Sequence, residues 1–327
     1  MVAPQDLYWH EGHSPDIVRY RPASIRQRHG ETIVATPIPT EAYAHCQRVT
    51  KAEAKNFYYA FVTLPGPRRR AIYAAYAFCR LCDDIADDDL PIEEKLQQLR
   101  EVEGALERAK NGQAEGLVYQ ALAHAVQEYG IPWEDLIEVI RGVEMDLTIT
   151  RYETFEDLRK YCYRVASVVG LICIQVCGYS DPKAREYAID LGLAMQLTNI
   201  LRDIKEDSEI GRIYLPQDEL ARFGYTEEQL MAGELNENFD KFMEFQVARA
   251  REYFTKGKQL LKLLPMRTRA CPSVLGGLYS HVLDAIEAKG YDVYERRISL
   301  TTREKLFLTV RLWCQSYVPL ERVITAW

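Results

Sequence analysis

Apolar residues recur at helical spacing along nearly the whole chain from about Glu41 onward, and the alternation typical of strands is rare. Prolines and glycines interrupt this pattern at residues 64–67, 130–132, 179–182, 215–216 and 264–265. These interruptions predict helices of about 15 to 30 residues. No stretch after Glu41 has the composition of a linker. The pattern therefore predicts a single all-α domain over residues 41–327, with helices long enough to surround a cavity.

Residues 1–40 differ from the rest of the chain because they mix proline, histidine and arginine without a helical pattern. They predict a poorly structured N-terminal leader, and they lack the apolar segment of a secretory signal. The longest apolar run, residues 165–178, is too short and too interrupted to span a bilayer. It predicts a buried helix instead.

Composition narrows the class of protein. The hydrophobic fraction of 47% and the charged fraction of 27% are typical of a globular protein. The net charge of −7 argues against nucleic-acid binding, which needs a basic face. The eight cysteines are too sparse for a disulfide scaffold, and Cys79 and Cys82 have no second pair nearby, which favours a structural role over a zinc site. We therefore expect a reducing, cytoplasmic location, with peripheral membrane contact left open.

A dense run of aspartates, Cys-Asp-Asp-Ile-Ala-Asp-Asp-Asp, begins at Cys82. On a helix of about 100° per residue, Asp83 and Asp87 continue the apolar stripe of Ile72, Tyr76 and Cys79. A cluster that only faced solvent would not need this pair on the buried stripe. The pattern predicts that Asp83 and Asp87 point inward.

A second stripe is more polar. Gly192, Gln196, Asn199, Asp203 and Asp207 share one face of a predicted helix. Two amides and two carboxylates are costly to bury unless a ligand satisfies them. The two stripes together predict a pair of acidic sites that face each other across a cavity.

Carboxylate and amide oxygens are the hard ligands that Mg²⁺ prefers, and Mg²⁺ commonly bridges to substrate phosphates. Two such sites would hold a small cluster of Mg²⁺ ions and bind a diphosphate as it leaves. Arg80, Arg202, Arg212 and Lys55 fit the same chemistry because arginine and lysine bind phosphate oxygens. The alternative is that Arg80 and Arg202 only neutralise neighbouring aspartates. A helical scaffold with acidic patches and no enzyme activity is the alternative for the whole chain.

Ionisation of a diphosphate also needs a dry, apolar wall. Residues 56–61 and 165–174 are rich in aromatic and apolar side chains, and aromatic faces stabilise cations. Small residues such as Ala166 and Gly170 would leave room for a long chain. Most of these positions are equally compatible with an ordinary core.

Several segments resemble the squalene/phytoene synthases, the head-to-head trans-prenyltransferases. They are YAFCRLCDDIADD from Tyr76, YCYRVASVVG from Tyr161, QLTNILRDIKEDSEIGRIYLPQDEL from Gln196 and GLYSHVLDAIEAKGYDVYERR from Gly277. The resemblance covers roughly residues 42–312. It implies an all-α isoprenoid-synthase helical bundle around a central hydrophobic channel.

The resemblance also implies roles for individual residues. Asp83 and Asp87 match the first Mg²⁺-binding motif and Asp203 and Asp207 the second, and Asn199 and Gln196 line the same site. The other matching positions are on the diphosphate side (Arg80, Arg212 and Tyr214) and in the channel (Tyr161). Before Phe57 several family members carry serines, whereas this chain has Ala54-Lys55-Asn56, so Lys55 or Asn56 would take the place of a hydroxyl contact.

The reaction that the resemblance implies joins two prenyl diphosphates through a cyclopropylcarbinyl diphosphate, with two or three Mg²⁺ ions. We expect a C30 product from farnesyl diphosphate, such as presqualene diphosphate, dehydrosqualene or squalene. The alternative is a C40 phytoene synthase that uses geranylgeranyl diphosphate. NADPH is compatible with the family but nothing in the sequence indicates it. A class I terpene cyclase and a head-to-tail elongase fit less well, because the second motif reads Asn199, Asp203 and Asp207 and is followed by GRIYLP.

Overall fold

The computed structural model describes residues 38–317, apart from the side chains of Lys55 and Asn56. The chain divides into a unit of residues 1–36 and a unit of residues 37–327, and only the second contains described residues. Nearly all of the predicted leader therefore lies outside the described residues. Within residues 38–317 there is no strand, only an isolated bridge between Arg151 and Ile213, so the all-α prediction is confirmed.

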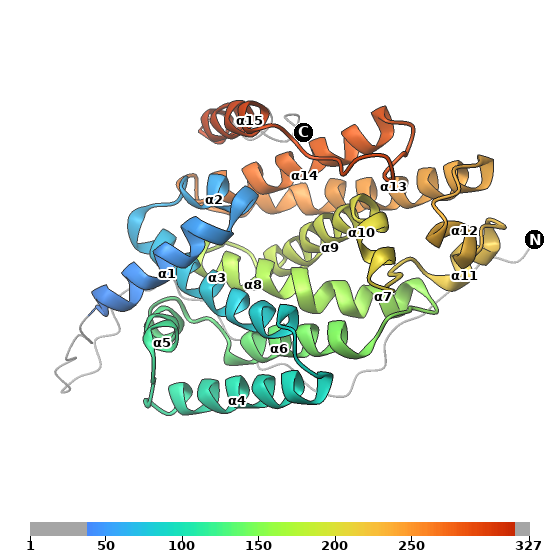
Figure 1. Ribbon diagram of the computed structural model, residues 1–327. Coiled ribbons are helices and arrows are strands. Elements are labelled where there is room, and N and C mark those ends of the chain that lie inside the picture. The colour runs from blue at the N-terminus through green and yellow to red at the C-terminus, as the bar shows by residue number, and fades with distance from the viewer. Residues whose placement is uncertain (1–37, 318–327) are drawn as a thin grey trace, which may run out of the picture. The chain divides into compact units, whose positions relative to one another are not determined.

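The helices follow one another with short connections (Figure 1). Their bounds are α1 Thr40–Glu53, α2 Lys55–Phe61, α3 Gly66–Asp87, α4 Ile92–Lys110, α5 Leu117–Tyr129, α6 Trp133–Thr148, α7 Phe155–Cys162, the π-helix η1 Tyr163–Ser167, α8 Val168–Cys177, α9 Ala184–Arg202, α10 Ile204–Glu209, α11 Gln217–Arg222, α12 Glu227–Met231, α13 Glu237–Gly257, the 3₁₀-helix η2 Lys258–Lys262, α14 Ala270–Ala288 and α15 Thr302–Gln315.

The predicted interruptions lie at the ends of helices, as their chemistry requires. Pro65 is the last residue before α3, and Pro216 precedes α11. Gly130 ends α5 with φ 67°, a left-handed conformation that glycine adopts without a steric penalty. Several helices are shorter than the predicted range, because further turns divide the stretches between the predicted interruptions.

Helix α9 is the centre of the packing. It contacts α13 and α14 on one side and α8 and η1 on the other, and α3 and α6 pack on α8 (Figure 1). The apolar run predicted to be buried forms η1 and α8, where Val168, Leu171 and Ile172 are buried. By length and composition alone Phe155–Cys177 would be long and apolar enough to cross a membrane, but half of its most apolar window is buried, as in a core helix.

The π-helix η1 lies between two glycines on neighbouring helices. A Cβ atom added to Gly192 of α9 would lie 2.6 Å from the Cα of Ser167, and one added to Gly142 of α6 would lie 2.9 Å from a methyl carbon of Val165. The wider π turn therefore fits only because these helices carry no side chain at the contact. Such turns are rare and are frequently found at functional sites.

Candidate active site

A cavity of about 210 Å³ lies between α2, α3, α8, α9 and α14. Asp83, Gln196 and Asn199 stand at one end of the lining, and apolar side chains form the rest. The cavity follows α3 from Asp83 back to Ile72, a distance of about 16 Å at 1.5 Å per residue. It has the form of an apolar channel with a polar mouth.

The first acidic motif is where α3 reaches this mouth. Asp83 lines the cavity, as predicted, and its neighbour on the same face, Cys79, lines it one turn deeper. The end of the Asp83 side chain reaches solvent at the mouth, but protein atoms surround the residue on most other sides. This partial removal from water is the main cause that raises the pKa of Asp83 to about 7, and the negative charge of Asp87 adds to it. Asp87, which was also predicted to point inward, lies on the last turn of α3, is exposed and is not among the side chains that line the cavity, so for Asp87 the prediction was wrong.

Arg80 neutralises the outer part of this motif. Its guanidinium pairs with Asp84 and lies 3.6 Å from the carboxylate of Asp87. Arg80 therefore balances the aspartates in the metal-free protein, and its place one turn from Asp84 leaves it close enough to the mouth to bind a diphosphate.

The second acidic motif is not one continuous helix, and this part of the prediction was wrong. Helix α9 ends at Arg202, Asp203 lies at the junction with φ −102°, and α10 begins at Ile204. The backbone still bonds in helical register, from the N–H of Asp203 to the carbonyl of Asn199. The break is therefore a kink at Asp203 that leaves the stripe only slightly displaced.

Asp203 and Asp207 have opposite electrostatic surroundings. Burial would raise the pKa of Asp203, but hydrogen bonds from Arg202 and Arg297, each 2.8 Å long at Nε, hold it below its usual value. Burial and the charge of Asp203 raise the pKa of Asp207 to about 7. One carboxylate is thus neutralised by arginines, and the other holds a proton near neutral pH.

Gln196 and Asn199 lie on the cavity side of α9, as predicted. The amide of Asn199 donates to the side-chain oxygen of Gln196 at 3.2 Å. The oxygen Oδ1 of Asn199 is buried without a hydrogen-bond partner. An unsatisfied carbonyl oxygen at a polar mouth fits a site that a cation or a ligand completes.

Asp146 of α6 joins the predicted residues, and the sequence analysis missed it. It accepts hydrogen bonds from the hydroxyls of Tyr214 at 2.8 Å and Tyr161 at 3.2 Å. Its negative charge raises the pKa of both Asp83 and Asp207, so it lies near both acidic motifs. Burial raises its own pKa, although the two tyrosines oppose that shift.

The tyrosines around Asp146 are stacked and buried. The rings of Tyr161 and Tyr214 have centroids 5.1 Å apart, and Tyr152 stacks on Tyr214 at 6.0 Å. Arg212 acts electrostatically on Asp146, Asp207 and Tyr214, so its predicted place beside the second motif agrees with the structure. These residues form a polar cluster around Asp146, and none of them, including Tyr161, is among the side chains that line the cavity.

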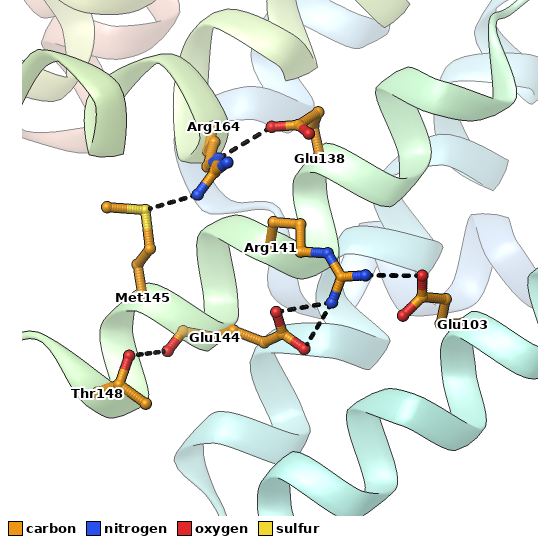
Figure 2. Close-up of polar contacts among 7 residues, drawn as sticks. All are labelled: Glu103, Glu138, Arg141, Glu144, Met145, Thr148 and Arg164. Carbon is orange, nitrogen blue, oxygen red and sulfur yellow. Dashed lines mark hydrogen bonds and ion pairs between the residues drawn. The ribbon is translucent and has the colours of Figure 1, made fainter.

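Helix α6, which carries Asp146, is tied to its neighbours by two arginines (Figure 2). Arg141 donates to Glu103 of α4 at 2.9 Å and to Glu144 one turn along α6. Arg164 of η1 donates to Glu138 at 2.9 Å. These half-buried pairs are still in contact with solvent, so they contribute little energy individually. They nevertheless connect α6 to η1 beside the point where Gly142 brings the two backbones together.

Aromatic side chains from α2 and α14 form part of the cavity lining. Phe57 lines the cavity, as expected, and its ring lies 6.3 Å from that of Tyr76 and 6.2 Å from that of Tyr279. The side chain of Lys55 lies outside the described residues, so its predicted contact is not placed. Tyr279 and Arg297 were not in the predicted set, although both belong to the C-terminal segment that carried the resemblance.

The donor set fits Mg²⁺ that is held jointly with a substrate. Among the described residues, no three acidic, histidine or cysteine side chains are grouped closely enough to hold an ion alone. Mg²⁺ characteristically keeps waters and uses one or two carboxylates together with phosphate oxygens. Two carboxylates of raised pKa and the unsatisfied oxygen of Asn199 are suitable ligands of this kind.

The raised pKa values predict a pH dependence of stability. Asp83 and Asp207 stabilise the metal-free fold below their unfolded pKa, near 4, and this contribution is lost as the pH rises through about 7. The contribution of Asp203 to stability changes with pH in the opposite direction. Because the pKa of Asp203 is lowered, its stabilising effect is present near neutral pH and is lost only as the pH falls through acidic values. We expect the melting temperature in EDTA to fall from about pH 5 to about pH 8.

Thermal melts of the protein and of Asp83→Asn/Asp207→Asn test this dependence. In the variant, the melting temperature should depend much less on pH. In the unmodified protein, Mg²⁺ with inorganic pyrophosphate should raise the melting temperature more at pH 8 than at pH 6. Equal slopes in the two proteins would contradict the assignment of the raised pKa values to these carboxylates.

Asp146→Asn is expected to destabilise the fold by about 1–3 kcal/mol, because one buried tyrosine hydroxyl loses its acceptor. A double-mutant cycle with Tyr214→Phe measures the coupling by chemical denaturation. Tyr214→Phe should cost less in the Asp146→Asn protein than in the unmodified protein. Additive effects would show that the two groups do not act together.

This chain is similar to a known family and to individual known proteins over most of its length. The squalene/phytoene synthase family model matches residues 50–304. A 15-cis-phytoene synthase of Synechococcus elongatus is 38% identical over 279 residues, covering 82% of this chain and 91% of that protein. Phytoene synthase 2, chloroplastic, of Solanum lycopersicum is 36% identical over 288 residues, covering 86% and 92%.

Solved structures of squalene and dehydrosqualene synthases have a fold similar to that of this chain. A dehydrosqualene synthase in complex with a ligand superposes with a TM-score of 0.77 at 27% identity, covering 84% of this chain and 95% of that one. A squalene synthase from Alicyclobacillus acidocaldarius gives 0.74 at 28% identity, covering 78% and 96%. The expected isoprenoid-synthase fold is confirmed. The chain is a prenyltransferase that belongs to the squalene/phytoene synthase family.

Proposed function

We propose that this chain condenses two molecules of geranylgeranyl diphosphate head to head to form a C40 hydrocarbon, phytoene. The observation that carries the proposal is that relatives with 35–38% identity over most of the chain are named phytoene synthases. They favour the C40 alternative over the C30 product that we expected from the sequence. The cytoplasmic location expected from the sequence stays a prediction.

The channel is compatible with a long prenyl chain. The positions that line it include many small side chains, and these widen it along its length. They are Ala75, Ala166, Gly170, Cys177, Ala188 and Gly192. Among the described residues, Asp83 is the only charged side chain that lines it, so the part where carbocations would form has an apolar wall that favours the exclusion of water.

Roles for the residues at the mouth follow from their chemistry. Asp83, Asp87 and Asp207, with Asn199, would hold two or three Mg²⁺ ions, and Asp203 would join them when its arginine partners turn to the diphosphate. Bound there, the ions would neutralise the charge of a departing diphosphate. Arg80, Arg212 and Lys55 would bind its oxygens, and Gln196 would orient Asn199. The faces of Phe57, Tyr76 and Tyr279 lie where a cation could be stabilised.

The proposed reaction consists of two successive ionisations. The first prenyl diphosphate loses pyrophosphate, its C1 carbon bonds to the double bond of the second, and proton loss closes a cyclopropylcarbinyl diphosphate. That intermediate loses the second pyrophosphate, rearranges and loses a proton, which needs no reductant. Asp146 accepts hydrogen bonds from Tyr161 and Tyr214 and acts electrostatically on both acidic motifs, and we assign to these three residues the orientation of the diphosphate and acceptance of a proton.

Product analysis tests the proposal. The protein is incubated with geranylgeranyl or farnesyl diphosphate and Mg²⁺, with and without NADPH, and the extracted lipid is identified by mass spectrometry. We expect a C40 hydrocarbon from geranylgeranyl diphosphate, no effect of NADPH, and a kcat/KM at least about tenfold lower for farnesyl diphosphate. A higher kcat/KM with farnesyl diphosphate, together with a C30 product, would contradict the proposal and show that the protein is a C30 synthase.

A further inference from the structure

Helix α15 carries apolar side chains on the face that points to solvent. Leu306, Phe307, Val310, Trp313 and Tyr317 are 56%, 67%, 49%, 41% and 48% exposed. At about 100° per residue the four that belong to α15 fall within roughly a third of the helix circumference, and Tyr317 follows two residues after the end of the helix. We call these five residues the outer stripe. A contiguous exposed apolar surface of this kind usually marks an interaction site.

Internal packing does not account for the outer stripe. The opposite face of α15 already supplies the contact with the rest of the protein, through the buried residues Leu308, Thr309 and Leu312. That face packs on α14 and α2, and a Cβ atom added to Gly277 of α14 would overlap the side chain of Leu312. Because α15 is apolar on both faces, its outer face is suited to a second apolar environment.

The charged residues beside the outer stripe indicate what kind of surface it would bind. Arg303 and Arg311 are exposed, and they form no ion pair within residues 38–317. Glu304 is the only acidic residue of α15, and its carboxylate accepts bonds from the backbone N–H and hydroxyl of Thr301. The exposed face therefore combines free cationic groups with tryptophan and tyrosine. This composition is typical of helices that lie in the headgroup region of an anionic bilayer.

The outer stripe is also close to the channel. Helix α15 covers α2 and α14 from outside (Figure 1), and these two helices contribute Phe57, Phe61, Leu275 and Tyr279 to the channel wall. If the proposed function holds, the product is a hydrocarbon without a polar group, and it must pass from the channel into a lipid phase. A bilayer at α15 would be separated from the channel only by these two helices.

We propose that the outer stripe of α15, with Arg303 and Arg311, docks this protein on the surface of a bilayer that contains anionic lipids. The apolar and aromatic side chains enter the headgroup boundary, and the two arginines bind lipid phosphates. The helix lies in the plane of the surface and does not span the membrane. This part of the proposal does not depend on which prenyl diphosphate the enzyme uses.

Cys314 gives a direct way to observe docking. It lies on the exposed side of α15 and is the only one of the eight cysteines that is exposed; the other seven are buried or half-buried. A thiol-reactive, environment-sensitive fluorophore on Cys314 of the full chain is mixed with phosphatidylcholine vesicles, with and without phosphatidylglycerol. We expect a blue shift and quenching by nitroxide-labelled lipids with the anionic vesicles, and a much weaker response with the neutral ones.

Unlabelled variants test the outer stripe independently by vesicle flotation. Phe307→Ser/Trp313→Ser should lower the partition coefficient by roughly tenfold or more. Arg303→Gln/Arg311→Gln should remove most of the dependence on phosphatidylglycerol. Met231→Ser/Leu235→Ser is the matched control, because these side chains are 48% and 47% exposed but lie outside α15. The control should bind like the unmodified protein, and circular dichroism should show that all variants fold.

Three results would overturn the proposal. The first is the absence of binding to anionic vesicles, and the second is equal binding by the Phe307→Ser/Trp313→Ser variant. The third is a probe already blue-shifted without lipid and not quenched by lipid nitroxides, because another part of the chain or a second copy would then cover the outer stripe. The flotation assay contains no substrate, so a C30 enzyme would still dock and a failed product assay would leave this result unaffected.

Discussion

Replacing Asp83 with asparagine is expected to lower kcat/KM by about 100-fold or more. The carboxylate lines the mouth of the channel, where burial raises its pKa to about 7. Asparagine keeps the size of the side chain but removes the negative charge that a divalent cation needs. Turnover in Mg²⁺ and calorimetric binding of inorganic pyrophosphate with Mg²⁺ should both be lost.

Two observations separate this loss from unfolding. Removal of a carboxylate with a raised pKa should leave the metal-free fold as stable as before, or more stable, at pH 8. Asp89→Asn is the matched control, because Asp89 belongs to the same acidic run but is exposed beyond the end of α3. It should retain nearly full turnover. If Asp83→Asn did so too, Asp83 would not be a metal ligand.

Replacing Gly192 with alanine is expected to lower the free energy of unfolding by about 2–3 kcal/mol. The new Cβ atom would lie 2.6 Å from the Cα and 2.8 Å from the backbone nitrogen of Ser167. Backbone atoms cannot move aside as the end of a flexible side chain can. Either α9 or η1 must therefore shift, and because Gly192 also lines the channel, the shift should lower activity.

Gly104→Ala provides the comparison. It makes the same substitution in a helix, but its nearest neighbour would be the guanidinium of Arg108 at 3.6 Å, an ordinary contact. This variant should be more stable by up to about 1 kcal/mol, because alanine has less conformational freedom in the unfolded chain. Chemical denaturation measures both changes. A Gly192→Ala protein as stable as Gly104→Ala would contradict the packing of η1 against α9.

Helical periodicity was enough to place the polar mouth. Asp83, Gln196 and Asn199 were assigned to inward stripes from the sequence, and all three line the cavity. Stripes of this kind depend only on local geometry, which is about 100° per residue in any α-helix. The kink at Asp203 was missed because a change of backbone direction within a helical run has no strong compositional signal.

Other residues of the site were missed for a different reason. Asp146 is a single aspartate in an amphipathic helix, and nothing in its neighbours along the chain distinguishes it from a surface residue. Its importance comes from Tyr161 and Tyr214, which reach it from other segments. Arg297 is likewise recognisable only because the chain after α14 brings it to Asp203.

The sequence by itself determined the helical class, several of the breaks between helices and the face on which Asp83, Gln196 and Asn199 lie, because these depend on residues close to one another along the chain. Only the tertiary structure decided which charges meet. It paired Asp203 with arginines, left Asp83 and Asp207 with raised pKa values, and brought Asp146 near both motifs. Burial and pKa depend on atoms from distant segments, and folding alone brings those segments together.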